Sequence, residues 1–222
     1  MRSDSDIQLR SAYDFSGMEA SFYPNHLESS KRGIDYDNPI QSKGFNLVAN
    51  VTDPSKDFDP PINSWQLNGL HVGAGLGDGA LTATDGRLFY QNGTAEETRY
   101  NQAHTLSDGG TPPFPWGIAV DATPDAEGVL HGISINAGSG QAGIQLAQFP
   151  EHYPILRTPR HRGPTWPATK RHVPENCVAI TLVPQCAELN ELQEGSMSSH
   201  EFANTVNCYA DVASIKWSEY GP

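Results

Sequence analysis

Long apolar runs, cysteines and basic residues are all scarce in this chain of 222 residues. No stretch reaches the roughly 18 apolar residues of a membrane-spanning helix, and the first thirty residues lack the apolar segment of a signal peptide. Lys and Arg total 14 against 26 Asp and Glu, a formal net charge of −12. Because such a charge repels phosphate backbones, we do not expect nucleic acid as a partner. Because a long apolar run is lacking, we do not expect a membrane span.

Local motifs of several enzyme classes are absent as well. The chain has no G-x-S-x-G, H-E-x-x-H or C-x-x-C, which removes local support for a serine hydrolase, a zinc protease or a thioredoxin-like enzyme. Its eight histidines are dispersed, without metal-ligand spacing. Residues 138–143 match G-x-G-x-x-G, but the following residues alternate like a strand and offer no helix N-terminus for a pyrophosphate. We expect no metal and no cofactor.

The cysteines and glycosylation sequons bear on the compartment. Cys177, Cys186 and Cys208 allow one disulfide with three possible pairings, and three reduced, buried thiols are the alternative. Asn50 and Asn92 each begin an N-x-Thr sequon and are candidate glycosylation sites. Together these features favour the secretory pathway or the extracellular space, with a leader absent from this sequence. A cytoplasmic location is the alternative.

Short apolar runs separated by turn residues predict an all-β fold, a β-sandwich or a barrel. Gly and Pro number 21 and 17, too many for long helices to dominate. Asp85-Gly86 lies between two strand candidates and predicts a hairpin turn. The glycine series 73, 75, 77 and 79 indicates a flexible loop or a bulge, compatible with a close approach of the backbone to a ligand. The predicted strands span residues 45–51, 65–72, 80–84, 87–91, 117–122, 129–135, 142–149, 177–183 and 212–217.

The polarity of the chain and the spacing of its apolar residues predict how it is organised. Residues 1–43 are polar and without a steady period, which indicates an irregular N-terminal arm, and residues 44–222 form a single β-rich domain. One short C-terminal helix is expected over residues 198–206, with Ser198 as the cap and Glu201 completing a capping box. Residues 157–172 are rich in Arg, Lys and Pro and predict an exposed basic loop.

Aromatic and polar side chains concentrate between residues 65 and 116. Ordinary core packing is one interpretation of them. The other is a hollow in the sheet structure, walled by aromatic rings, into which a hydrogen-bond donor points. The candidate donors and catalytic groups are His71, Arg87 and Tyr90, and the candidate substrate-binding residues are Trp65, Phe89, Tyr100, His104 and Trp116.

Residues 44–54, 71–76 and 86–97 resemble a family of small secreted β-rich fungal proteins, most of which lack an assigned activity. Residues 173–177 and 184–186 extend the resemblance to about four fifths of the chain. The missing leader and the basic segment 157–172 depart from the family pattern. Through this family the chain also resembles the fungal hetero-Diels–Alderases that join a tropolone quinone methide to a sesquiterpene alkene such as humulene.

The resemblance implies a cofactor-free pericyclase that acts on apolar natural-product precursors in fungal secondary metabolism. Holding two apolar partners in a reactive arrangement lowers the barrier by about 7–11 kcal/mol at best, and a donor to the heterodiene carbonyl lowers it further. A non-catalytic secreted or cell-wall protein that binds a glycan or an apolar small molecule is the alternative. A homodimer is compatible with both.

Overall fold

The computed structural model describes residues 7–8, 10–11, 40–124, 131–149, 152–157 and 176–217. Strands dominate these residues, and the single α-helix among them is five residues long. The elements in chain order are β1 (Ile7–Gln8), β2 (Arg10–Ser11), β3 (Ile40–Ser42), β4 (Gly44–Val51), η1 (Pro54–Lys56), β5 (Gln66–Gly73), β6 (Leu76–Thr82), β7 (Phe89–Asn92), α1 (Ala95–Arg99), β8 (His104–Gly109), β9 (Phe114–Pro124), β10 (His131–Ala137), β11 (Gln145–Phe149), β12 (His152–Arg157), β13 (Ile180–Ala187), β14 (Val206–Cys208) and η2 (Val212–Ser214).

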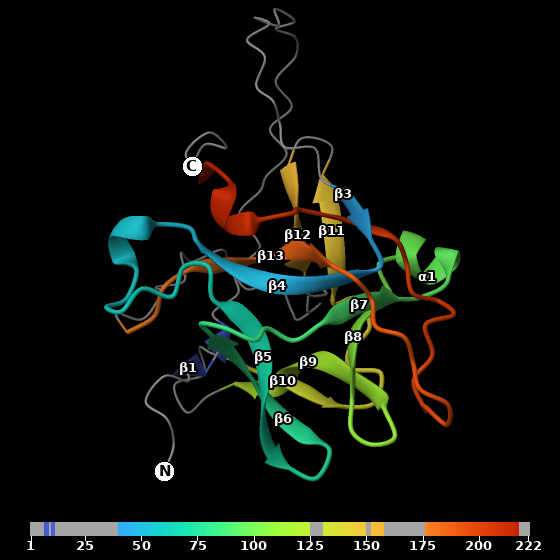
Figure 1. The fold of residues 1–222 in the computed structure, drawn as a ribbon. Helices are drawn as coiled ribbons and strands as arrows, with labels where there is room; N and C mark the ends of the chain where they lie inside the picture. Colours follow the sequence, from blue (N-terminus) through green and yellow to red (C-terminus); the bar gives the residue numbers. More distant parts are fainter. Residues whose placement is uncertain are drawn as a thin grey trace, which may run out of the picture.

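Seven antiparallel strands form a closed barrel (Figure 1). Their order is β6-β5-β4-β7-β8-β9-β10, and β10 returns to β6 through the pair Ser134 and Asp78. β13 pairs with β4 along its whole length, and β11–β12 and β14–β3 form separate two-stranded sheets. In the part of the arm that is described, β1 pairs with β6, β2 with β10 and β3 with β14.

Alternating side chains of the barrel strands build its core. On β4, the apolar alternation of Phe45, Leu47, Ala49 and Val51 places all four in one buried cluster. This strand is therefore predicted correctly from the sequence, as is β5. Strands β7, β9, β10 and β13 contribute to the same cluster, which includes Phe89, Ile118, Ile133, Ile135, Ile144 and Leu182. Apolar side chains thus pack the barrel interior, so a candidate site has to be sought in the wall.

The glycine series forms the line along which the barrel closes. A Cβ atom on Gly77 would stand 2.8 Å from the carbonyl oxygen of Ile135, and one on Gly79 would stand 2.9 Å from the side chain of Ile133. Missing side chains on β6 therefore allow the backbone of β10 to come close. Gly77 N–H donates to Asn136 Oδ1 at 3.0 Å, and Ala137 N–H donates to the carbonyl of Gly75 at 2.9 Å.

The predicted C-terminal helix is wrong. Residues 198–205 form turns and an isolated bridge between Ala203 and Asn92, and residues 206–208 are strand β14. The short helix lies in mid-chain instead, where Thr94 and Glu97 complete the capping box that begins α1. Both segments carry the local sequence signal of a capping box. In residues 198–208, pairing with β7 and β3 overrides this signal and no helix forms.

The hairpin at Asp85-Gly86 and the last predicted strand are also wrong. Asp85 has the positive φ of a turn, 59°. However, β6 pairs with β5 and β10, whereas β7 pairs with β4 and β8, so the turn connects strands that are not neighbours. Residues 212–214 form the 3-10 helix η2, and Val212 and Ile215 are buried against β4 and β13.

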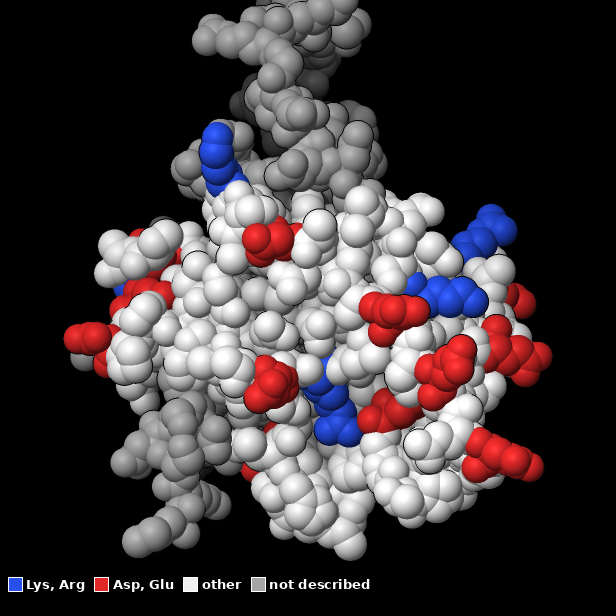
Figure 2. All heavy atoms as spheres, viewed as in Figure 1, with Lys and Arg blue, Asp and Glu red and all other residues white. Residues whose placement is uncertain are grey.

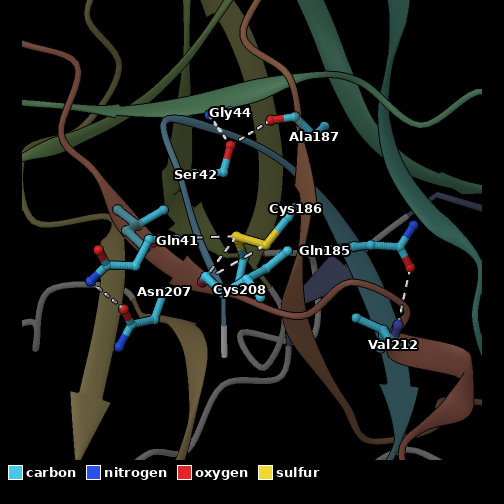
Figure 3. Close-up of a disulfide and its surroundings, with 11 residues drawn as sticks. Gln41, Ser42, Gly44, Gln185, Cys186, Ala187, Asn207, Cys208 and Val212 are labelled. Atoms are coloured by element: carbon cyan, nitrogen blue, oxygen red, sulfur yellow. Dashed lines mark hydrogen bonds between the residues drawn. A yellow bond between two sulfur atoms is a disulfide. The ribbon is translucent and has the colours of Figure 1, made fainter. Parts of the chain in front are cut away.

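A disulfide joins Cys186 on β13 to Cys208 on β14 (Figure 3). It is one of the three pairings left open by the sequence, and Cys177 is a free, half-buried thiol. Around the bridge, Ser42 Oγ donates to the carbonyl of Ala187 at 2.7 Å. The C-terminal segment is thereby tied to the barrel through β13.

Two further sequence predictions concern segments that the structure covers little or not at all. Residues 158–175, most of the basic segment, lie outside the described residues, as does most of the arm.

Among the described residues, no helix has the length and apolar character required to cross a membrane.

We predict that Gly77→Ala destabilises the fold by about 1–3 kcal/mol, because the added methyl group has to push β6 away from the β10 backbone. Gly73→Ala is the matched control, since a Cβ there meets only Leu76 side-chain atoms at 3.5 Å or more. Urea unfolding of the two variants checks the prediction. Equal midpoints would contradict the assignment of β6–β10 as a tight seam.

We also predict that alkylation and mass spectrometry find Cys177 modified and Cys186 linked to Cys208. The bridge spans 22 residues, so Cys186→Ser/Cys208→Ser should cost about 3 kcal/mol by the loop-entropy estimate. Cys177→Ser serves as the control. A bridge that involves Cys177 would contradict the structure.

Candidate functional site

Arg87 lies where pairing between β5 and the rest of the barrel is incomplete. β4 pairs with β5 only at Val48 and Gln66, and with β7 only at residues 44–45. The segment that precedes β7 runs between β5 and β4. There the Arg87 backbone N–H donates to the carbonyl of Leu67 at 3.0 Å. Asn46 Nδ2 holds this segment from β4 by donating to the carbonyl of Arg87 at 3.0 Å. The Arg87 backbone is therefore fixed from both sides.

The Arg87 guanidinium reaches across to β8 and β9. Its Nε–H donates to Ser107 Oγ at 2.6 Å, and Ser107 itself is fully buried. Its Cζ lies 5.2 Å from the centre of the Trp116 ring, in the range of a cation–π contact. Contacts with β8 and β9 thus determine the position of one cationic group in the barrel wall.

Two glycines provide the room for this group. A Cβ on Gly69 of β5 would stand 2.9 Å from Arg87 Nη1, and one on Gly109 of β8 would stand 2.8 Å from Arg87 Nη2. The Gly109 Cβ would also stand 2.7 Å from Trp116 Nε1. Any larger residue at either position would displace the guanidinium.

Trp116 adds an aromatic surface next to the cation. The Phe114 ring stacks on it, with the ring centres 5.4 Å apart and 27° between the planes. Trp116 as a whole is half-buried, while its Nε1 is buried without a hydrogen-bond partner. An unpartnered buried donor is costly and uncommon in folded proteins. We call the group of Arg87, Ser107, Phe114 and Trp116 the Arg87 cluster.

Asp108 is the acidic group that influences the Arg87 cluster. Burial lowers the pKa of Arg87 below its ordinary value, while the negative charge of Asp108 raises it in part. No salt bridge joins these two residues among the described part of the chain. An arginine side chain stays protonated in a protein even when it is partly buried, so the cluster carries a positive charge.

The Asp108 carboxylate is engaged by two other side chains. Tyr90 OH donates to Oδ1 at 3.3 Å, and His200 Nε2 donates to Oδ2 at 2.8 Å. Since an ionised carboxylate only accepts, His200 must carry its proton on Nε2. The Tyr90 and His200 rings also meet edge to face at 4.7 Å. These contacts hold residues 196–204 against the outer face of the barrel.

Most of the predicted site residues are not brought together. Arg87 and Trp116 are in contact, as shown above. Tyr90 is buried at the outer face of the barrel in a small cluster with Leu106 and Ala203. The others are dispersed: Phe89 is in the barrel core, Trp65 packs half-buried against that core, His71 is exposed on β5, His104 is half-buried at the start of β8, and Tyr100 is 60% exposed beside Arg99.

The two candidate glycosylation sites differ in surroundings. Asn50 is only 6% exposed and its Nδ2 donates to Thr181 Oγ1 at 3.4 Å, so a glycan would require this side chain to leave the sheet. Asn92 is half-buried at the end of β7. Attachment at Asn50 is thus disfavoured by the folded structure.

Sequence reasoning missed Ser107, Asp108 and His200 as members of this region. No strand was predicted at 104–109, although Thr105 and Ser107 alternate with Leu106 there. Polar residues at inward positions mask the usual apolar alternation. His200 was assigned to a helix, and its contact with Asp108 spans 92 residues of sequence.

Charge on the face drawn in Figure 2 is mainly acidic, with few basic side chains among the acidic ones. The described residues contain no group of three or more His, Cys, Asp or Glu that is suited to a metal ion. A cation in the barrel wall therefore stands out against its surroundings.

Comparison with known proteins places the chain in a family. Residues 42–186 match a family described as a domain of unknown function, DUF7907. The chain belongs to this family. It is also 43% identical over 204 residues to "Antigenic protein SchS34" of Stachybotrys chartarum, which covers 82% of this chain and 92% of that relative. No solved structure matches. The DUF7907 match includes the whole barrel and every member of the Arg87 cluster.

For Tyr90 we predict a loss of stability at alkaline pH. Burial and the Asp108 charge raise the pKa of Tyr90 above its ordinary value of 10.0. The unfolded chain therefore releases this proton first, and stability is present below pH 10 and falls as the pH rises further. We therefore compare the free energy of unfolding, measured with urea between pH 8 and 11. For the wild type it should fall by up to about 1.4 kcal/mol per pH unit more than for Tyr90→Phe. Tyr100→Phe should behave like the wild type; identical slopes for all three would refute the assignment.

Proposed function

We propose that the protein binds apolar, conjugated small molecules at the Arg87 cluster and promotes their cycloaddition as a cofactor-free pericyclase. The observation that carries the proposal is the contact between Arg87 and Trp116, at 5.2 Å, which unites a cationic donor and a flat apolar surface. The contact also joins a predicted catalytic residue to a predicted substrate-binding residue that is far from it in the sequence.

The chemistry requires a polarised carbonyl and a fixed arrangement of two partners. A hydrogen bond from the Arg87 guanidinium to the carbonyl of a heterodiene withdraws electron density and accelerates its reaction with an electron-rich alkene. The contact of Nε with Ser107 at 2.6 Å fixes the direction of the guanidinium. Stacking on Trp116 and Phe114 would orient the flat heterodiene. The resemblance to the hetero-Diels–Alderases supports an enone-like tropolone quinone methide and a sesquiterpene alkene as substrates.

Non-catalytic binding of a glycan or an apolar molecule is the second candidate. It is favoured by the positions of His71, which is exposed, and Tyr90, which is buried with Asp108 on the outer face. Neither donor touches the Arg87 cluster among the contacts described. Binding through the Trp116 and Phe114 rings would then occur without turnover.

A secretory-pathway or extracellular location is part of the proposal. The disulfide between Cys186 and Cys208 supports it, because such bridges persist mainly in oxidising compartments. A homodimer remains compatible with either function.

A cycloaddition assay tests the pericyclase proposal. The protein is incubated with a tropolone quinone-methide precursor and humulene, and rate and stereochemical ratio are compared with buffer. We expect acceleration and an altered product ratio, and Arg87→Gln should lower the accelerated rate by about 10²-fold through loss of the charged donor. Arg99→Gln is the control, because Arg99 forms a similar cation–π contact with exposed Tyr100.

Equal rates and equal product ratios with and without the wild-type protein would reject the pericyclase. Saturable binding of the substrates in that experiment, without turnover, would favour the binding protein instead.

A further inference from the structure

We propose that the ligand of the Arg87 cluster carries an ionised oxygen on a flat conjugated ring, as in an aromatic carboxylate or an acidic enol. This goes beyond the proposed function, which requires only a flat conjugated partner with a carbonyl oxygen, and it rests on the same cluster. A negative charge on the ligand is inferred from Arg87, whose guanidinium has N–H donors that the described residues do not use.

Arg87 has donors that the protein does not use. A guanidinium carries five N–H groups, and the Nε–H is taken by Ser107. Within the described part of the chain, neither Nη1 nor Nη2 has a hydrogen bond or an ion pair. Neither atom is fully buried: among the described residues, the buried side-chain nitrogen and oxygen atoms without a partner belong to His104, Trp116 and Ser198. Nη1 and Nη2 therefore keep some contact with solvent. A fork of accessible donors fits the two oxygens of a carboxylate or the adjacent oxygens of an enolised ketone.

Asp108, the acidic group whose charge acts on Arg87, does not fill this fork. Its Oδ1 accepts from Tyr90 and its Oδ2 accepts from His200, so both oxygens are held at the outer face of the barrel. Asp108 still acts on Arg87 through its charge without an ion pair. The cationic group in the wall is thus partly balanced electrostatically and left without a direct anionic partner.

Shape and polarity around the fork select for a flat ring. Gly69 and Gly109 lie directly against Nη1 and Nη2, where a Cβ atom on either residue would collide with the guanidinium. Trp116 and Phe114 form a stacked pair on one side. An anion held by the fork therefore meets an aromatic surface. With a net charge of −12 on the whole chain, long-range attraction for anions is absent, so selectivity for an anion has to come from this contact.

The test is isothermal titration of the full chain with 2-naphthoate and its neutral isostere 2-naphthamide. We expect 2-naphthoate to bind about 10-fold more tightly or better, since charge-assisted hydrogen bonds are roughly twice as strong as neutral ones. Arg87→Gln should remove this preference and change 2-naphthamide affinity by less than about 2-fold. Arg99→Gln should leave both affinities unchanged.

Equal binding of the two probes to the wild type, binding of neither, or an anion preference that survives in Arg87→Gln would each overturn the inference. If Arg87→Gln does not fold, Arg87→Lys replaces it: the retained charge should preserve part of the preference, and loss of the planar fork should lower 2-naphthoate affinity. Unchanged affinity in that variant would contradict the fork geometry.

The two proposals fail separately. An anion preference without any acceleration of cycloaddition would reject the pericyclase and leave the ligand class standing. Acceleration together with equal binding of the probes would reject the ligand class alone.

Discussion

Contact between β6 and β10 is the constraint on which the rest of the barrel depends. A sheet of seven strands becomes a closed barrel only when its two edges meet, and this meeting removes the edges that would otherwise pair with other chains. Gly77 and Gly79 permit it, because a side chain at either position would collide with β10. Closure fixes β5, through β6, relative to β8 and β9, through β10. The position of Arg87 between them follows from this.

A packed interior explains why the candidate site lies in the wall. The inward side chains of the barrel are mostly apolar, and a charge among them would be costly to bury without a partner. Arg87 avoids much of this cost because its terminal nitrogens keep contact with solvent while its Nε bonds to Ser107. The arrangement yields a cation that is held in place and whose terminal donors are not used by the described residues.

The sequence predicted the fold class and several strands because apolar alternation reflects the two faces of a strand directly. Residues 45–51 are the clearest example, and they match β4. Three predictions were wrong for one reason: the capping pattern at Ser198, the turn at Asp85 and the alternation at 212–217 are local signals, whereas long-range pairing decided the outcome. Whether residues 1–43 and 44–222 are separate units stays a prediction.

For the candidate site, the sequence supplied Arg87 and Trp116 but could not place them in contact. Their meeting depends on the order of β5, β4, β7, β8 and β9, which no local pattern encodes. Ser107 and Asp108 were missed because their strand lacks a regular apolar face. Tyr90 and Phe89 are neighbours in sequence, yet strand geometry directs them to opposite faces, so only one of them lies in the barrel core.

Nuclear magnetic resonance of the arginine side chains tests the central claim most directly, namely that the barrel wall holds the Arg87 guanidinium in one orientation. Because Nε–H donates to buried Ser107 at 2.6 Å, the account predicts a resolved Arg87 Nε–H signal, assigned by its loss in Arg87→Lys, that exchanges with water much more slowly than that of Arg99. Exchange of the two signals at the same rate would show a mobile side chain and contradict the account.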